Sequence, residues 1–274
     1  MSTPRETSTS RDRLGDRMKW YESVPRTRLV PKTPVLARLD GKAFHTFTRG
    51  MDKPVDWRMQ RCMWAAAKHL CENIQGCRLA YVQSDETTLL LVDYESIKSE
   101  AWFDYEIQKM CSVSASLATV AFLDAYLREF PGRGSLPTFD ARFWNLPPQE
   151  VTNAFIWRQQ DATRNSIACL AQAHFSHAEL HGKDARAMQD MLFQQKGINW
   201  NDCPVPQKRG VCLVRESYTA PNPHEPGAPD VVRARWIVDE DIPVFTQDRR
   251  YVERFVAPVT DSNGDATAEG PSTT

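Results

Sequence analysis

The order of strand-like and helix-like segments in the first 145 residues is the feature that most restricts the fold of this chain. A strand-forming run ends at the turn dipeptide Asp40-Gly41, a helix follows it, and a hairpin comes next. A second long helix and a fourth strand then complete the order β-α-β-β-α-β. We expect these six segments at 35–39, 57–75, 78–84, 87–94, 100–129 and 138–144. The order predicts an α+β fold with the split, ferredoxin-like core that polymerase palms also use.

Helix signals at both long helices support this order. Asp56 is a plausible N-cap for the first helix, in which Met59, Met63 and Leu70 recur at helical spacing until Gly76 ends it. The second helix is rich in apolar residues and stops before Pro131-Gly132. Both segments are long enough to cover one face of a small sheet.

Two carboxylates are expected to meet at one end of this sheet. Asp40 closes the first strand, and Asp85-Glu86 forms the tight turn of the hairpin. If the first strand pairs with the third, Asp40 and Asp85 converge. Two carboxylates beside a backbone carbonyl form an oxygen-rich site suited to one or two Mg²⁺ ions, which phosphoryl and nucleotidyl transfer require.

Composition limits the partners of the chain. The formal net charge of the 274 residues is -1, so contact with nucleic acid requires a local basic patch. We expect no membrane partner and a cytoplasmic location, because no apolar run reaches membrane-spanning length and the N-terminus has no secretory signal. The seven cysteines form no C-x-x-C pair, which favours reduced, packed thiols.

The second half of the chain has a different character. A helix is expected through 151–173, with strands at 210–216, 231–238 and 250–256. These patterns predict four parts: a disordered N-terminus at 1–11, a palm-like catalytic domain at 12–145, a helical and β-strand extension packed on it at 146–259, and a disordered tail at 260–274.

The two carboxylate motifs together resemble a known family. R-L-D-G-K-A-F-H at 38–45, followed by Q-S-D-E at 83–86, is similar to the tRNA-histidine guanylyltransferase superfamily. Within it the chain looks most like the bacterial, archaeal and phage guanylyltransferase-like proteins, which are 3′-to-5′ RNA polymerases. The resemblance runs from about residue 15 to beyond 210. It implies two Mg²⁺ ions, ATP and GTP or other nucleoside triphosphates as substrates, tRNA as partner, and a homo-tetramer.

The resemblance also implies roles for individual residues. Asp40, Asp85 and the Gly41 carbonyl are the expected metal ligands, and Asp40, Asp85 and Glu86 the expected catalytic residues. Glu86 could instead orient a metal ligand or cap the hairpin. The expected nucleotide- and phosphate-binding residues are Lys42, Ala43, Phe44, His45, Ser84, Lys109, Arg142, Asn165, Lys208 and Arg209.

Two qualifications apply to these basic positions. A basic residue that the family has three or four positions before Lys109 is absent here, where Tyr105 and Glu106 stand. For Lys208 and Arg209, a solvated surface charge is an equally good interpretation.

One departure from the family indicates a branch. Eukaryotic members, which add a single guanylate to histidine tRNA, carry H-I-N-N-L-Y where this chain has T-R-N-S-I at 163–167. This form, with G-I-N-W-N-D-C-P at 197–204, resembles the guanylyltransferase-like branch, which repairs truncated tRNA 5′ ends by templated addition. We therefore expect a Mg²⁺-dependent nucleotidyltransferase that adds nucleotides in the 3′-to-5′ direction. The alternatives are addition of a single G to histidine tRNA, a palm-type nucleotide cyclase, and a non-catalytic RNA-binding protein.

A competing metal site involves three histidines. His174, His177 and His181 would share one face of an unbroken helix and could ligate zinc. Ser176 and Glu179, however, have the spacing of a capping box, which predicts that a new helix begins after His174. RNA or phosphate contact by these histidines, or simple packing, is the preferred interpretation.

Overall fold

A computed structural model describes residues 13–96, 98–221 and 229–257. Its centre is a six-stranded antiparallel sheet in the order β4-β1-β3-β2-β5-β6. The strands are β1 (Val35–Gly41), β2 (Cys77–Gln83), β3 (Glu86–Leu91), β4 (Phe139–Asn145), β5 (Val211–Ala220) and β6 (Val231–Asp239). The expected α+β class is confirmed, as is the pairing of the first strand with the third. Strands from the second half of the chain extend the same sheet, because β5 pairs with β2.

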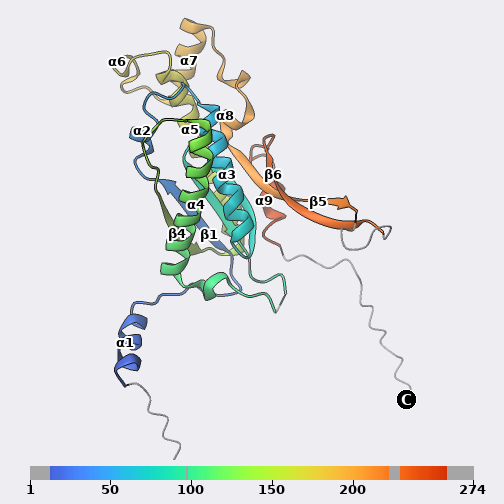
Figure 1. The fold of residues 1–274 in the computed structure, drawn as a ribbon. Coiled ribbons are helices and arrows are strands. Elements are labelled where there is room, and N and C mark those ends of the chain that lie inside the picture. Colours follow the sequence, from blue (N-terminus) through green and yellow to red (C-terminus); the bar gives the residue numbers. More distant parts are fainter. Residues whose placement is uncertain (1–12, 97, 222–228, 258–274) are drawn as a thin grey trace, which may run out of the picture.

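Helices cover both faces of the sheet (Figure 1). The long ones are α3 (Trp57–Asn73), α4 (Ile107–Glu129), α5 (Pro148–Gln172) and α7 (Ala185–Lys196). The short ones are α2 (Phe44–Phe47), α6 (His177–Leu180), α8 (Val205–Arg209) and α9 (Arg250–Glu253), with 3₁₀ turns at Trp102–Tyr105 and Trp200–Asp202. The leading helix α1 (Arg13–Ser23) has no buried residue and lies at the opposite end of the molecule from α2 (Figure 1).

Alternation along β1 explains why the sheet has two cores. Val35, Ala37 and Leu39 pack on the side of α3 and α4, whereas Leu36 packs on the side of α5. All four are at most 1% exposed. Successive side chains of a strand point to opposite faces, so the apolar residues on each face of β1 need a cover of their own. The strand that carries Asp40 is therefore fixed from both sides.

The expected helix at 100–129 begins later than predicted. α4 starts at Ile107, and Phe103, Asp104 and Tyr105 have left-handed φ values of 51–54°. Backbone bonds from Ile107 N to the Thr27 carbonyl (2.9 Å) and from Leu29 N to the Tyr105 carbonyl (3.1 Å) attach this segment to the chain before β1. Tertiary hydrogen bonding thus overrides the local helical pattern.

α4 also corrects the expectation that no apolar run reaches membrane-spanning length. The helix has 23 residues, and an 18-residue window within it reaches a mean hydropathy of 1.5, so by length and composition alone it could cross a bilayer. Here Met110, Ser114, Ala118 and Phe122 form one buried stripe that covers the sheet. The opposite side of α4 exposes Val120.

The expected strand at 250–256 is wrong. Residues 250–253 form α9, and Val252 is fully buried in the core on the α5 side of the sheet. Tyr251 stacks on Phe245, and Phe255 packs against Tyr251. Apolar residues at 252 and 255 are also compatible with one turn of helix, and a short apolar run does not distinguish the two. The segments predicted to be disordered, 1–11 and 260–274, lie outside the described residues.

Candidate active site

The two carboxylates expected at the end of the sheet do converge. Asp40 faces Glu86 across β1 and β3, and Asp140 across β1 and β4. Gly41 N donates a hydrogen bond to the Asp85 carbonyl at 3.1 Å, which places the turn after β2 beside the end of β1. Gln83 of β2 and Glu86 of β3 are paired with each other, so the turn between the strands consists of Ser84 and Asp85. Ser84 has a φ of 51°. The expected Asp85-Glu86 turn is therefore shifted by one residue, and Glu86 belongs to β3.

The electrostatics of this pair suit a cation. Burial raises the pKa of the Asp85 carboxyl above its ordinary value, and the nearby negative charge of Asp40 raises it further. A divalent ion between the two would remove this cost, since it replaces like-charge repulsion with attraction. The Asp40 and Asp85 carboxylates and the Gly41 carbonyl are the hard oxygen donors that Mg²⁺ takes, so the residues present fit the expected metal.

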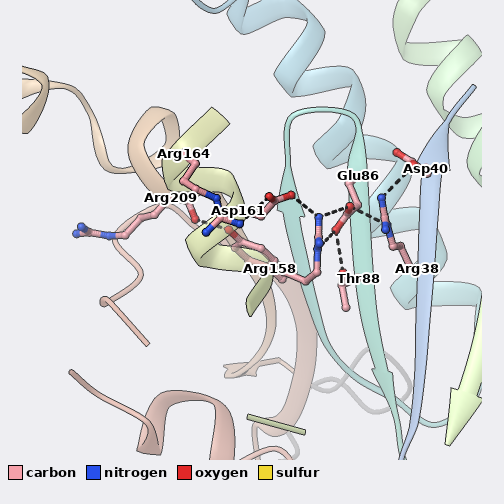
Figure 2. A network of polar contacts seen from close by, with 9 residues as sticks. Arg38, Asp40, Glu86, Thr88, Arg158, Asp161, Arg164 and Arg209 are labelled. Carbon is pink, nitrogen blue, oxygen red and sulfur yellow. Dashed lines mark hydrogen bonds and ion pairs between the residues drawn. The ribbon is translucent and has the colours of Figure 1, made fainter. Parts of the chain in front are cut away.

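Glu86 is held by arginines (Figure 2). Its side chain is buried, and its two oxygens accept from Arg158 Nε and Nη2, both at 2.7 Å. Arg38 Nε forms an ion pair with the same carboxylate at 2.7 Å, and Arg38 Nη2 reaches Asp40 at 3.1 Å. Since both oxygens of Glu86 are engaged, the structure favours the interpretation in which it orients a metal ligand.

Arg158 was not among the predicted site residues, although its position on an apolar helix stripe indicates a buried charge. Arg158 lies at helical spacing on the stripe of α5 that contains Val151, Phe155 and Ala162, all of which pack in the core. A charged residue on an apolar stripe requires a buried partner. Burial tends to lower the pKa of the Arg158 guanidinium, but the hydrogen bonds to Glu86 outweigh this and raise it. The group therefore stays charged.

A cavity of about 350 Å³ adjoins the carboxylates. Asp85 lines it, and its walls come from the segment 44–60, from α5 and from α8. Of the predicted nucleotide-binding residues, this cavity brings together Phe44, His45, Ser84 and Asn165. A pocket of this size, adjoining two carboxylates, is suited to a nucleotide.

Polar cavity residues that the sequence did not single out come from one loop and from glutamines on several elements. The loop 52–56 contributes Asp52 and Lys53, and it contains a cis peptide bond before Pro54. Elsewhere, the carboxamides of Gln60, Gln83 and Gln172 line the wall. No local motif marks these residues, because only tertiary packing brings them together.

Some predicted residues lie next to the cavity without lining it. Lys42 is exposed and directly follows Gly41, and its backbone N donates to the Thr138 carbonyl at 2.8 Å. Ala43 takes a left-handed conformation (φ 56°) and starts α2. Lys208 Nζ donates to the Asn201 carbonyl, and Arg209 Nε to the Ile242 carbonyl. Their phosphate-binding roles stay predictions.

Two further predicted residues are placed elsewhere on the fold. Lys109 is in the first turn of α4, with its ammonium 4.5 Å from the centroid of the Phe103 ring. That turn is attached to the chain before β1, at the opposite end of the sheet from Asp40. Arg142 is exposed on the edge strand β4, 3.3 Å from Asp140. Within one chain, neither is among the residues of the cavity.

The capping box at Ser176 is confirmed, with both of its hydrogen bonds to Glu179 present. His174 therefore precedes the break, and the rings of His177 and His181 are 6.2 Å apart. In the described part of the chain, no three or more His, Cys, Asp or Glu side chains are grouped to hold a metal ion. The three histidines thus do not form the zinc site that an unbroken helix would have allowed.

Comparison with known proteins identifies the family. A family model described as tRNAHis guanylyltransferase (Thg1) matches residues 15–147. The tRNA(His) guanylyltransferase of Debaryomyces hansenii is 33% identical over 209 residues, which cover 70% of this chain and 77% of the relative.

Two solved structures agree with this assignment. A bacterial tRNA(His) guanylyltransferase (Thg1)-like protein in complex with ATP has a TM-score of 0.81 and 44% identity, and a second one in complex with GTP has a TM-score of 0.75 and 43% identity. Each comparison covers 89% of this chain and 99% of the other. The chain therefore belongs to the tRNAHis guanylyltransferase family and is a nucleotidyltransferase.

Proposed function

We propose that the protein adds nucleotides in the 3′-to-5′ direction to the 5′ end of tRNA, selecting each by pairing with the opposite strand. The observation that carries this proposal is the position of Asp85. It belongs both to the carboxylate pair with Asp40 and to the wall of the 350 Å³ cavity. A nucleotide in that cavity would have its phosphates beside the two carboxylates. The ATP- and GTP-bound neighbours support nucleoside triphosphates as substrates.

The reaction requires two transfers at this one site. In the first, the 5′-monophosphate of the RNA attacks the α-phosphate of ATP and pyrophosphate leaves. In the second, the 3′-hydroxyl of an incoming nucleoside triphosphate attacks the activated 5′ phosphate and AMP leaves. Two Mg²⁺ ions held by Asp40, Asp85 and the Gly41 carbonyl would supply the charge stabilisation that phosphoryl transfer requires. The cavity walls hold the nucleotide, and Arg38 holds the Asp40 carboxylate at 3.1 Å.

The strand order supports a polymerase-palm interpretation. Within the six-stranded sheet, the four strands of the first half lie in the order β4-β1-β3-β2, each antiparallel to its neighbour. This is the arrangement expected of a split β-α-β core, with α3 and α4 on one face. Asp40 lies near the end of β1 and Asp85 in the turn that leads into β3, so the two carboxylates stand at one end of two adjacent central strands.

The segment 163–167 bears on the choice of base. Asn165 and Ser166 both line the cavity, but Ser166 Oγ accepts from Trp200 Nε1 at 3.1 Å. Arg164 is bound to Asp161 at 3.0 Å. In this segment Asn165 is therefore the uncommitted polar side chain that faces the cavity. One amide is a weak basis for choosing a single base, so selection by duplex geometry is the better explanation.

The alternative is addition of a single guanylate to histidine tRNA, the activity in the name of the Debaryomyces relative. The discriminating experiment uses tRNAs that lack the first 5′ nucleotide, with the opposing base varied among all four. Templated repair predicts incorporation of the complementary base in each case, with little advantage for histidine tRNA. Addition of guanylate regardless of the opposing base, and only to histidine tRNA, would establish the alternative. Incubation with ATP or GTP alone tests for a cyclase product.

We also propose a homo-oligomer, with the tetramer of the resemblance as the expected form, in the cytoplasm. On α4, two large apolar side chains, Val120 and Leu127, are 65% and 53% exposed. α1 similarly exposes Trp20 and Tyr21. Large apolar side chains left exposed on one helix are typical of a contact surface, so a second copy of the chain is the expected cover for Val120 and Leu127.

A further inference from the structure

A single charged layer interrupts the otherwise apolar contact between α5 and the sheet. Val151, Phe155 and Ala162 of α5 belong to the same buried apolar cluster as Leu36 and Leu90 of the sheet. Arg158, on the same stripe of the helix, instead meets Glu86, and both residues are buried, at 6% and 3% exposure. Figure 2 shows the guanidinium lying along the Glu86 carboxylate, with Arg38 on the other side.

Stability alone does not explain this layer. A buried ion pair stabilises a fold weakly, because the cost of removing two charges from water offsets their attraction. Replacement of a buried ion pair by well-packed apolar residues of similar volume is often neutral or stabilising. The layer therefore calls for a reason beyond packing.

The contacts continue from Arg158 to the expected metal ligand. Arg158 donates hydrogen bonds to both oxygens of Glu86 at 2.7 Å, and Arg38 Nε forms an ion pair with the same carboxylate at 2.7 Å. Arg38 then holds the Asp40 carboxylate at 3.1 Å. In the described part of the chain, Arg38 is the one side chain that hydrogen-bonds Asp40. The orientation of Asp40 thus depends on where Glu86 holds Arg38.

We propose that Arg158 is a positioning residue for nucleotidyl transfer, which holds the Asp40 carboxylate in its metal-binding orientation through Glu86 and Arg38. The inference rests on the proposed function, because it assigns the metal to Asp40 and Asp85. The planar fork of Arg158 suits this role, since two parallel bonds fix both the position and the plane of the Glu86 carboxylate. A lysine would supply the charge without fixing that plane.

Arg158 is itself held from outside the core. Asp161, one turn along α5, accepts from Arg158 Nη2 at 2.8 Å and from Arg164 at 3.0 Å. The guanidinium also lies 4.4 Å from the centroid of the Trp157 ring. With charge partners on two sides, the fork has one preferred orientation. The same helix then continues to Asn165 in the cavity wall, so α5 links the nucleotide pocket to the carboxylates.

The test compares Arg158→Lys with the neutral double variant Glu86→Gln/Arg158→Gln. Four quantities are measured on full-length protein: the melting temperature, the Mn²⁺ affinity by electron paramagnetic resonance without RNA, and kcat and KM for ATP in 5′ activation of tRNA. Arg235→Lys serves as the matched control, because Arg235 on β6 forms an exposed pair with Glu216 on β5, outside the layer.

We expect Arg158→Lys to fold, to bind Mn²⁺ about 10- to 100-fold more weakly, and to lose kcat by a similar factor with KM for ATP nearly unchanged. The double variant should be at least as stable as the lysine variant, since it buries no charge, and should remain slow. Arg235→Lys should match wild type in all four quantities.

Normal Mn²⁺ affinity and kcat in Arg158→Lys would overturn the proposal, whatever its melting temperature. So would full recovery of kcat in the double variant, because packing alone would then suffice. A wild-type protein that binds Mn²⁺ but activates no RNA would refute the proposed function instead, and the Mn²⁺ affinities would still decide the role of Arg158. A wild type without Mn²⁺ affinity would overturn both.

Discussion

Replacement of Gly41 by alanine should destabilise the fold through one identifiable clash. A Cβ built at Gly41 lies 2.3, 2.5 and 2.6 Å from three ring carbons of Phe44. Ordinary carbon contacts are about 3.5–4.0 Å, so the ring would have to retreat by more than about 1 Å. Phe44 is only 3% exposed, and its ring packs on Phe47, Phe139 and Phe122 at centroid distances of 4.8, 5.2 and 5.5 Å. It has no free space to enter.

Overpacking of this kind costs about 1–3 kcal/mol. Phe44→Ala, in contrast, leaves a hole and should cost about 3–5 kcal/mol. In the double variant the new methyl group occupies part of that hole. The double variant should therefore lose less stability than the two single variants added together, by about 1–3 kcal/mol. Because the Gly41 carbonyl is an expected metal ligand, nucleotidyl transfer by Gly41→Ala should also fall, by about 100-fold for a 1 Å displacement.

Urea denaturation of the four proteins measures this cycle, and initial rates of 5′ activation measure the second effect. Strict additivity in the double variant would contradict the reasoning, because the alanine methyl group and the Phe44 ring would then not compete for space. A Gly41→Ala protein with wild-type stability would contradict it as well. Wild-type stability of Gly41→Ala would mean that the end of β1 can shift without loss of free energy of unfolding.

Three other outcomes are expected. Asp85→Asn should abolish transfer, yet in the absence of metal it should raise the melting temperature. Burial and the charge of Asp40 raise the pKa of the Asp85 carboxyl in the folded protein. The ionised carboxylate therefore lowers stability as the pH rises from about 3.8, its ordinary pKa, through its pKa in the folded protein. The gain should be larger at pH 7.5 than at pH 4.5, and a constant gain would falsify this sign. Asp56→Ala removes the cap of α3 and should cost about 0.5–2 kcal/mol in urea denaturation; an unchanged midpoint would count against the cap. Val120→Glu with Leu127→Glu on α4 should lower the molar mass measured by light scattering, and an unchanged mass would exclude this face as the interface.

The parts of the fold that depend on local pattern could be predicted from the sequence. Asp56 begins α3 as expected, the β1 strand ends at Asp40-Gly41, and the pairing of β1 with β3 brings Asp40 to Asp85. Each has a local signal, such as a cap, a turn dipeptide or an apolar run. The convergence of the carboxylates then follows from strand order, and it was the most informative inference that sequence alone allowed.

The parts that depend on distant contacts could not be predicted. Residues 100–106 are apolar enough for a helix, but bonds to Thr27 and Leu29 impose another conformation. The loop before α3 joins the cavity wall through tertiary packing, and no motif marks it. Arg158 had a signal, as a charge on an apolar stripe, but its partner Glu86 is 72 residues away in the chain. Lys109 matched a family position, yet α4 begins at the far end of the sheet.

The placement of β1 has a consequence for how substrates enter and leave. β1 is hydrogen-bonded along its length to β3 on one side and β4 on the other, and it is packed on both faces. Its amide protons should therefore be among the slowest in the molecule to exchange with solvent. The floor of the site that carries Asp40 is then rigid on the timescale of turnover. We therefore expect any opening that admits an RNA end or releases pyrophosphate to come from the cavity walls, such as the loop 52–56 and α8.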